Sequence, residues 1–196
     1  MKTKALFIDR DGVINELYYE PDYGIIESPL IPEQIRLVFG IVPLLKTAKK
    51  LGYKIIIISN QPNVALGKTT ESNFKRISKK ITELLKKEGV TIDGEYYCFH
   101  HPFAKVKKLR KKCHCRKPGT ALFLEASKEY NIDLNASWMI GDGVADVLAG
   151  KSAGCKTILL ANIEATENLR IIEQQLKDSK PDYIIKRLTD AVSIIK

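Results

Sequence analysis

The amino-terminal stretch LFIDRDGVIN places two carboxylates, Asp9 and Asp11, directly after a run of apolar residues. In an extended chain these two side chains would point to the same side, and close carboxylates repel each other unless a cation or a proton lies between them. Their hard oxygen atoms suit Mg²⁺, and Gly12 allows the chain to turn sharply behind them. The pattern predicts a magnesium site, although a turn or a helix cap would explain a single pair equally well.

Other polar residues follow later apolar runs in the same way. Asp142 ends WMIGD, and Asp146 lies one helical turn further on, where the helix dipole alone would also favour an acid. Ser59 and Asn60 follow the run KIIII, and their side chains can donate hydrogen bonds to phosphate oxygens. Lys117, in CRKPG, can place a positive charge opposite the carboxylates. Together these residues indicate a site for a phosphorylated ligand and a divalent cation.

A second set of metal-binding residue types lies in the segment YYCFHHPFAKVKKLRKKCHCRKP. It contains two short clips, Cys98-x-His100 and Cys113-x-Cys115. Three thiolates and one imidazole form a tetrahedral set for Zn²⁺ with no open position, which predicts a structural zinc. His100 is preferred over the two other histidines of the segment because a one-residue spacer then separates both pairs. Unmetallated core cysteines are the alternative, and that interpretation is preferred for the separate Cys155.

The positions of these residues require a set of alternating strands and helices. We expect strands at residues 4–8, 54–58, 94–98, 138–141, 156–160 and 182–186. We expect helices at residues 40–51, 70–87, 120–130, 144–153, 165–178 and 189–195. The strands are continuously apolar, as in sheets covered on both faces. The order therefore predicts an α/β fold, a doubly wound, Rossmann-like parallel sheet with helices on both faces, whose ligands bind beyond the carboxyl ends of the strands.

The chain length favours a single domain over residues 1–196, because 196 residues with 44% hydrophobic composition can bury one substantial core. The intervals between the polar motifs have no room for a large inserted domain that could cap the site, so three loops, 15–32, 62–69 and 99–116, would shape an open site. The net charge of +9 is concentrated in residues 105–117, which favours anionic partners. The sequence shows no signal peptide or membrane span, which predicts a cytoplasmic protein without a membrane partner. We also expect a monomer.

The ordered set of motifs resembles the haloacid dehalogenase superfamily of phosphohydrolases, over nearly the whole chain. That family reads DxD, then Ser or Thr, then Lys, then GDxxxD. The resemblance implies that Asp9 is the nucleophile and that Asp11 is the general acid and then the base. It implies that Ser59 and Lys117 bind the transferring phosphoryl group.

The same resemblance implies that Mg²⁺ binds a carboxylate oxygen of Asp9, the backbone carbonyl of Asp11, and Asp142, while Asp146 supports Lys117 or a metal-bound water. The stretch FIDRDGVIN, together with the cysteine segment, is similar to a narrower group, the D-glycero-D-manno-heptose 1,7-bisphosphate phosphatases and the histidinol-phosphate phosphatases. This implies hydrolysis of a small phosphorylated sugar, most simply the heptose bisphosphate, in lipopolysaccharide or surface-glycan biosynthesis.

The resemblance also implies a set of substrate contacts. They are Leu17, Tyr18, Tyr19, Glu20, Asn60, Gln61, Pro62 and, for the second phosphate or the sugar, Arg116. The chain departs from the group at NQPNVALG, where Pro62 and Asn63 replace a Ser-Gly turn, and at Gly143, where a lysine can occur. These departures fall in the pocket and leave the phosphate chemistry intact.

Two other functions are compatible with parts of the sequence. A nucleic-acid 3′-phosphatase could use the 105–117 cations, but that segment lacks aromatic residues interleaved with the lysines for base stacking, which disfavours a nucleic-acid partner. A non-catalytic binding module would be expected to lose Asp9 or Asp142, because clustered carboxylates destabilise a fold that binds no metal.

Overall fold

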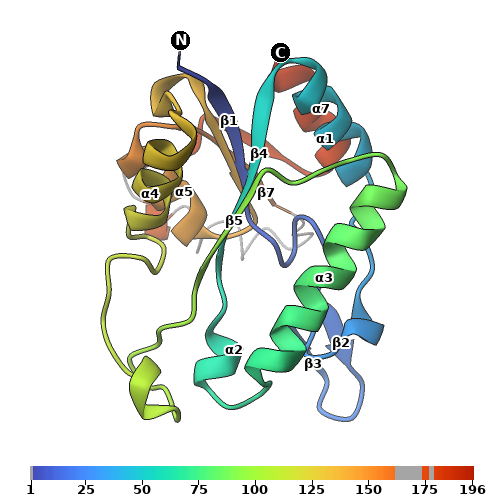
Figure 1. Cartoon of the computed structure of the whole chain (residues 1–196), viewed down its shortest axis with the longest axis vertical. Helices are drawn as coiled ribbons and strands as arrows, with labels where there is room; N and C mark the ends of the chain where they lie inside the picture. The colour runs from blue at the N-terminus through green and yellow to red at the C-terminus, as the bar shows by residue number, and fades with distance from the viewer. Residues whose placement is uncertain (1, 162–173, 177–178) are drawn as a thin grey trace.

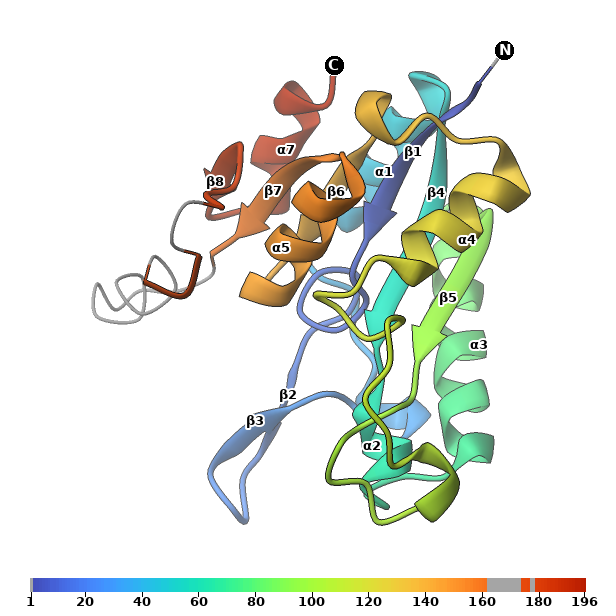
Figure 2. The same cartoon turned by 90° about the vertical axis from the view of Figure 1, so that its left-hand side faces the viewer.

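The computed structural model describes residues 2–161, 174–176 and 179–196. Within them, parallel strands form a six-stranded sheet in the order β5-β4-β1-β6-β7-β8. Figure 1 shows the sheet nearly edge-on between its helices, and Figure 2 labels its strands. The strands of this sheet are β1 (Lys4–Ile8), β4 (Tyr53–Asn60), β5 (Gly94–Cys98), β6 (Trp138–Gly141), β7 (Lys156–Leu160) and β8 (Tyr183–Ile185). The prediction of a doubly wound parallel sheet is confirmed, and all these strands end at the same edge.

Helices cover both faces of the sheet because successive strand residues point to opposite sides (Figure 2). The helices on one face are α1 (Ile41–Lys50), α3 (Glu71–Lys87) and α7 (Leu188–Ile194), and those on the other are α4 (Ala121–Tyr130) and α5 (Val144–Ala153). In β1, Leu6 and Ile8 pack in the first core, whereas Ala5 and Phe7 pack in the second. Continuous apolar strands are thus explained by burial on both sides.

The predicted helix ends are also confirmed. The side chain of Thr70 caps α3 by accepting a hydrogen bond from the backbone nitrogen of Asn73 at 3.1 Å. Asn131 ends α4 in the left-handed region, with φ of 51°, and Gly154 ends α5 with φ of 92°. The helix predicted at residues 165–178 falls largely outside the described residues.

Short elements occupy the three segments predicted as loops. Strands β2 (Tyr18–Glu20) and β3 (Ile25–Glu27) form an antiparallel hairpin, and α2 (Pro62–Ala65) follows β4. The 3₁₀ helix η2 (Lys107–Leu109) lies in the third of these segments. Two further 3₁₀ helices are η1 (Pro32–Gln34) and η3 (Leu134–Ala136). The hairpin lies beyond the carboxyl ends of the sheet strands (Figure 2). Its apolar residues are exposed, Ile26 to 68%. The hairpin therefore lacks the alternation of buried and exposed residues from which strands are predicted.

The described residues contain no large cap domain, as the motif spacing predicted. No helix among them has the length and apolar character needed to cross a membrane.

Candidate active site

Three carboxylates meet at the carboxyl edge of the central strands. Asp9 follows β1 and Asp142 follows β6, and these strands are direct neighbours. Carboxylate oxygens of Asp9, Asp142 and Asp146 lie within 4.8 Å of one another. The Nζ atom of Lys117 lies 2.9 Å from Oδ1 of Asp9 and 2.5 Å from Oδ1 of Asp146, and it donates a third bond to the carbonyl oxygen of Ile58. The structure thus brings together residues from three distant parts of the sequence, and the buried ammonium group of Lys117 pairs with two of the three carboxylates.

The charges of this cluster do not balance. Burial opposes the charge of Lys117, but Asp146 and Asp9 outweigh it and raise the pKa of that lysine above its ordinary value. Burial, followed by repulsion from Asp9 and Asp146, raises the pKa of Asp142 to about 7. Among the described residues, Asp142 forms no ion pair. One ammonium facing three carboxylates leaves an excess of negative charge, and this set of hard oxygen donors fits a divalent cation such as Mg²⁺.

Gly12 allows Asp142 to approach the first loop closely. Gly12 has a φ of 85°, and a β-carbon placed on it would lie 2.0 Å from Oδ2 of Asp142. Any side chain at this position would displace that carboxylate, so the glycine permits the close approach of Asp142.

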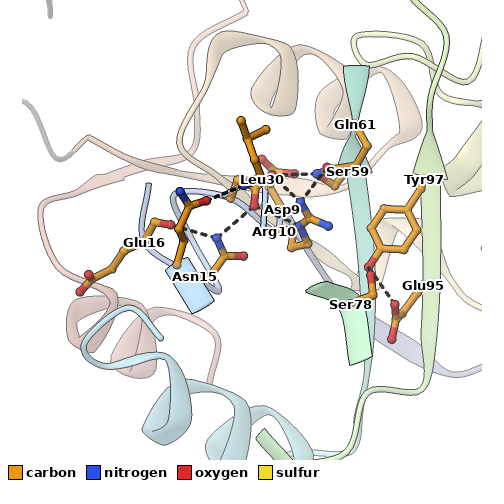
Figure 3. A network of polar contacts seen from close by, with 12 residues as sticks. Asp9, Arg10, Asn15, Glu16, Leu30, Ser59, Gln61, Ser78, Glu95 and Tyr97 are labelled. Carbon is orange, nitrogen blue, oxygen red and sulfur yellow. Dashed lines mark hydrogen bonds and ion pairs between the residues drawn. The ribbon is translucent and has the colours of Figure 1, made fainter. Parts of the chain in front are cut away.

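The carboxylate of Asp11 is not part of the cluster of three carboxylates. It is bound by Arg10, Asn15 and Gln61, which are labelled in Figure 3. It accepts two hydrogen bonds from Arg10, at 3.0 and 2.9 Å, one from Asn15 at 3.0 Å and one from Gln61 at 2.8 Å. Strand β1 ends before Asp9, and the backbone nitrogens of Ile14 and Asn15 then donate hydrogen bonds to the carbonyl of Arg10. That Asp9 and Asp11 point to the same side stays a prediction.

The contacts of Asp11 favour its ionised form. Burial opposes the charge, but the Arg10 guanidinium and the hydrogen bonds from Gln61 and Asn15 outweigh it and lower the pKa of Asp11 below its ordinary value. Arg10 itself is 1% exposed, and its guanidinium carbon lies 5.2 Å from the ring centre of Phe74. In this arrangement Asp11 is a carboxylate that can accept a proton. It can act as a proton donor only after it has been protonated.

The residues after β4 connect this network to the phosphate-binding groups. Gln61 donates to Oγ of Ser59 at 3.0 Å, so the Ser59 hydroxyl accepts this bond and keeps its own hydrogen for a ligand oxygen. Asn60 donates to the carbonyl of Lys117 at 3.1 Å and accepts from its backbone nitrogen at 2.9 Å. Asn60, expected to contact substrate, therefore positions the backbone of Lys117.

Comparison with known proteins shows the family to which this chain belongs. A family model described as HAD-hydrolase-like matches residues 114–191. A D-glycero-β-D-manno-heptose-1,7-bisphosphate 7-phosphatase from Helicobacter pylori is 37% identical over 195 residues, covering 99% of this chain and 98% of that protein. The protein of the same name from Pasteurella multocida is 34% identical over 193 residues, covering 98% and 97%. The chain belongs to the HAD-like hydrolase family.

This HAD-like hydrolase is a phosphatase, as the order of its motifs predicted. Its fold matches that of a D,D-heptose 1,7-bisphosphate phosphatase from B. bronchiseptica, crystallised with magnesium and phosphate, with a TM-score of 0.77 and 22% identity. The match covers 98% of this chain and 97% of the other.

The predicted zinc ligands of this phosphatase converge into one cluster. The cluster consists of Cys98, His100, Cys113 and Cys115. Its sulfur atoms lie 3.2 to 3.6 Å apart, and Nδ1 of His100 lies 3.2 Å from Sγ of Cys115. Zn–S bonds of about 2.3 Å give a tetrahedral edge of about 3.8 Å, so this Cys₃His set fits zinc with a small expansion. His100 is the histidine of the cluster, as its spacing predicted, and Cys155 is buried in the core.

Only one of the predicted substrate contacts lines the cavity next to the carboxylate cluster. A cavity of about 660 Å³ opens beside Asp142, and Leu17 is among its lining residues. Tyr18, Tyr19 and Glu20 form strand β2 and are not among them. Arg116 also lies elsewhere, with its Nη1 atom 3.4 Å from the carbonyl oxygen of His100. Pro62 is the first residue of α2, and its contact with substrate stays a prediction.

Several residues of the site were missed by the sequence analysis. Arg10 lies between the two aspartates of the first motif, and its position in DRDG is the signal that could have drawn attention to it. Lys186 and Arg187 line the cavity, and they follow β8 directly. Applying the rule of polar groups beyond strand ends to this last strand would have found them.

Proposed function

We propose that this phosphatase hydrolyses D-glycero-D-manno-heptose 1,7-bisphosphate at its 7-phosphate, with Mg²⁺ as the catalytic cofactor. The observation that carries the chemistry is the cluster of Asp9, Asp142 and Asp146 around Lys117 at the edge of the sheet. The substrate rests on the relatives of that name, which are 34% and 37% identical over nearly their full lengths. We also propose that residues 1–196 form a single catalytic domain and that the protein acts as a monomer. A cytoplasmic location stays a prediction.

The reaction begins at Asp9. Lys117 pairs with Oδ1 of Asp9, which leaves Oδ2 to attack phosphorus. A bond forms between Asp9 and phosphorus as the bond from phosphorus to the sugar oxygen breaks, giving an aspartyl-phosphate and an alkoxide. Ser59 donates a hydrogen bond to the transferring phosphoryl group, and Lys117 neutralises part of its charge.

Asp11 completes both halves of the reaction. In its protonated form it gives a proton to the alkoxide, which leaves as the sugar hydroxyl. As a carboxylate, the form that Arg10 and Gln61 stabilise, it takes a proton from the water that attacks phosphorus and regenerates Asp9. When bound, Mg²⁺ shields the attacking carboxylate from the charge of the phosphate. Asp9, Asp142 and the backbone carbonyl of Asp11 would hold it.

Phosphate release from a panel of substrates tests this proposal. The panel contains both anomers of heptose 1,7-bisphosphate, a heptose monophosphate, histidinol phosphate and a 3′-phosphorylated oligonucleotide. We expect the highest kcat/KM for the heptose bisphosphate, in the presence of Mg²⁺. Asp9→Asn should abolish release, whereas Asp22→Asn, on the exposed hairpin turn, should not. Unchanged turnover by the Asp9 variant would reject the nucleophile, and faster hydrolysis of histidinol phosphate would reject the substrate.

A further inference from the structure

Gln61 is buried between two residues that the proposed reaction uses. It is 4% exposed, although the sequence-based expectation made it a substrate contact. Its amide nitrogen donates two hydrogen bonds, to Oδ2 of Asp11 at 2.8 Å and to Oγ of Ser59 at 3.0 Å. A carboxamide nitrogen carries two hydrogens, so both are committed to the protein and neither is free for a ligand.

Arg10 determines which way the amide of Gln61 points. Its Nη2 atom donates to Oε1 of Gln61 at 2.7 Å and to Oδ2 of Asp11 at 2.9 Å (Figure 3). A flipped amide would place its oxygen against the Asp11 carboxylate and its nitrogen against the guanidinium, and both contacts would be repulsive. The observed orientation is therefore the one that presents both donors to Asp11 and Ser59.

Arg10 and Gln61 are themselves held from several sides. The guanidinium carbon of Arg10 lies 5.2 Å from the ring centre of Phe74 and 5.8 Å from that of Tyr97, within the range of cation–π attraction. The backbone nitrogen of Gln61 donates to the carbonyl of Cys98, the last residue of β5, at 2.7 Å. Packing and hydrogen bonds thus fix this pair, as the support of a precise catalytic site requires.

We propose that Gln61, oriented by Arg10, is a positioning residue that aligns Asp11 and Ser59 for both steps of the phosphatase reaction. One amide group sets the direction of the group that transfers protons and of the hydroxyl that donates to the phosphoryl group. This inference rests on the roles proposed above for Asp11 and Ser59. It replaces the expectation that Gln61 contacts the substrate.

The two steps depend on this alignment to different degrees when the leaving group changes. A sugar alkoxide is strongly basic and needs the proton that Asp11 gives in the first step. The p-nitrophenolate ion is a weak base and leaves phosphorus without a proton. Hydrolysis of the aspartyl-phosphate needs Asp11 as a base with either substrate. Loss of alignment should therefore slow the second step more than the first when p-nitrophenyl phosphate is the substrate.

The test replaces Gln61 with methionine, which has a similar length and no hydrogen-bond donor. The matched control is Ser137→Ala, which also removes a buried side chain that forms hydrogen bonds. Ser137 is fully buried at the opposite edge of the sheet, where its Oγ atom donates to the carbonyl of Asp133 at 2.6 Å and accepts from the backbone nitrogen of Ala5 at 2.9 Å. Each protein is assayed with Mg²⁺ on the heptose bisphosphate and on p-nitrophenyl phosphate, and its Tm is measured by circular dichroism.

We expect Gln61→Met to lower kcat for the sugar phosphate about 100-fold, the loss that a displacement of about 1 Å within a catalytic site produces, with KM changed less than about threefold. The first step with p-nitrophenyl phosphate should slow only about tenfold, because it needs no general acid. A pre-steady-state burst of p-nitrophenolate, larger than that of wild type, should therefore appear. Ser137→Ala should keep wild-type kcat and show no such burst, even where its Tm falls.

Three results would overturn the inference. An unchanged kcat would mean that Gln61 aligns neither residue, and a higher KM with unchanged kcat would make it a substrate contact. An equal loss on both substrates without a burst would reduce its role to stability. If the methionine variant fails to fold, Gln61→Glu supplies the test, because it keeps the size and the bond from Arg10 but turns both donors into acceptors. Wild-type kcat in that variant would likewise overturn the inference.

Failure of the roles proposed for Asp11 and Ser59 gives a different pattern. Asp11→Asn and Ser59→Ala are assayed alongside. If either keeps wild-type kcat, the role proposed for that residue falls, and this inference falls with it. If both lose activity while Gln61→Met does not, this inference alone falls. The comparison with p-nitrophenyl phosphate holds for any sugar phosphate that the enzyme hydrolyses, so an error in the heptose assignment leaves the test intact.

Discussion

Replacing Gly12 with alanine should disable the site while leaving the fold in place. The new β-carbon would lie 2.0 Å from Oδ2 and 2.7 Å from Cγ of Asp142, where contacts below 3.0 Å essentially never occur. The carboxylate must therefore move by at least the difference between 3.0 and 2.0 Å. Asp142 contributes to the proposed magnesium site, so this movement should change both metal binding and turnover.

Two free energies describe the expected effect. The left-handed backbone at Gly12, with φ of 85°, costs an alanine about 1 to 2 kcal/mol of stability. That cost corresponds to a fall in Tm of a few degrees in a chain of this length. A displacement of about 1 Å within a catalytic site can reduce the rate about 100-fold, equivalent to about 2.7 kcal/mol in the activation barrier.

The matched control is Gly52→Ala. Gly52 has a φ of 82°, and no heavy atom lies within 4 Å of its added β-carbon. Both variants thus bear the same backbone strain, and only the Gly12 variant meets Asp142. We would measure kcat/KM as a function of Mg²⁺ concentration, together with thermal unfolding by circular dichroism. Equal activity of the two variants would refute the argument that the close approach at Gly12 places the carboxylate of Asp142.

Three further predictions concern charge and metal. Asp142 has a pKa of about 7 in the metal-free fold and about 3.9 in an unfolded chain. The metal-free folded state therefore holds an extra proton between these values, and relative to Asp142→Asn it should lose stability as pH rises from about 4 to 7. Tm measured in Mg²⁺-free buffer with the zinc site loaded should show this slope, and saturating Mg²⁺ should remove it; a slope of the opposite sign would contradict the assignment. Lys117→Met should destabilise the protein by about 3 to 5 kcal/mol in urea unfolding, because it leaves buried carboxylates uncompensated, and adding Asp146→Asn should recover part of this loss. A loss below about 1 kcal/mol would show that Lys117 is not their counter-ion. Cys113→Ser should release one bound zinc, measured by elemental analysis, and lower kcat, whereas Cys155→Ala should retain both zinc and activity. Because Cys115 lies two residues before Lys117, we expect zinc to hold the backbone that carries this lysine, and full activity without zinc would exclude that role.

The sequence alone determined the elements and the order of the motifs. Strands β5, β6 and β7 have the predicted bounds, because apolar runs of strand length between turn residues are local signals. Thr70, Asn131 and Gly154 end or begin helices where predicted, since caps and left-handed residues act within a few positions. The four zinc ligands could be selected for the same reason, because each pair is separated by one residue.

Only the tertiary structure decided which groups each of these side chains meets. Asp11 was expected to act beside Asp9, and only the structure shows that its carboxylate is bound by Arg10 and Gln61. Asn60 binds the backbone of Lys117 rather than the cavity. Side-chain direction beyond a strand end depends on the turn that follows and on partners far away in sequence. Neither is encoded in the spacing of a motif, and that is why the chemistry of this site was predictable from sequence while its contacts were not.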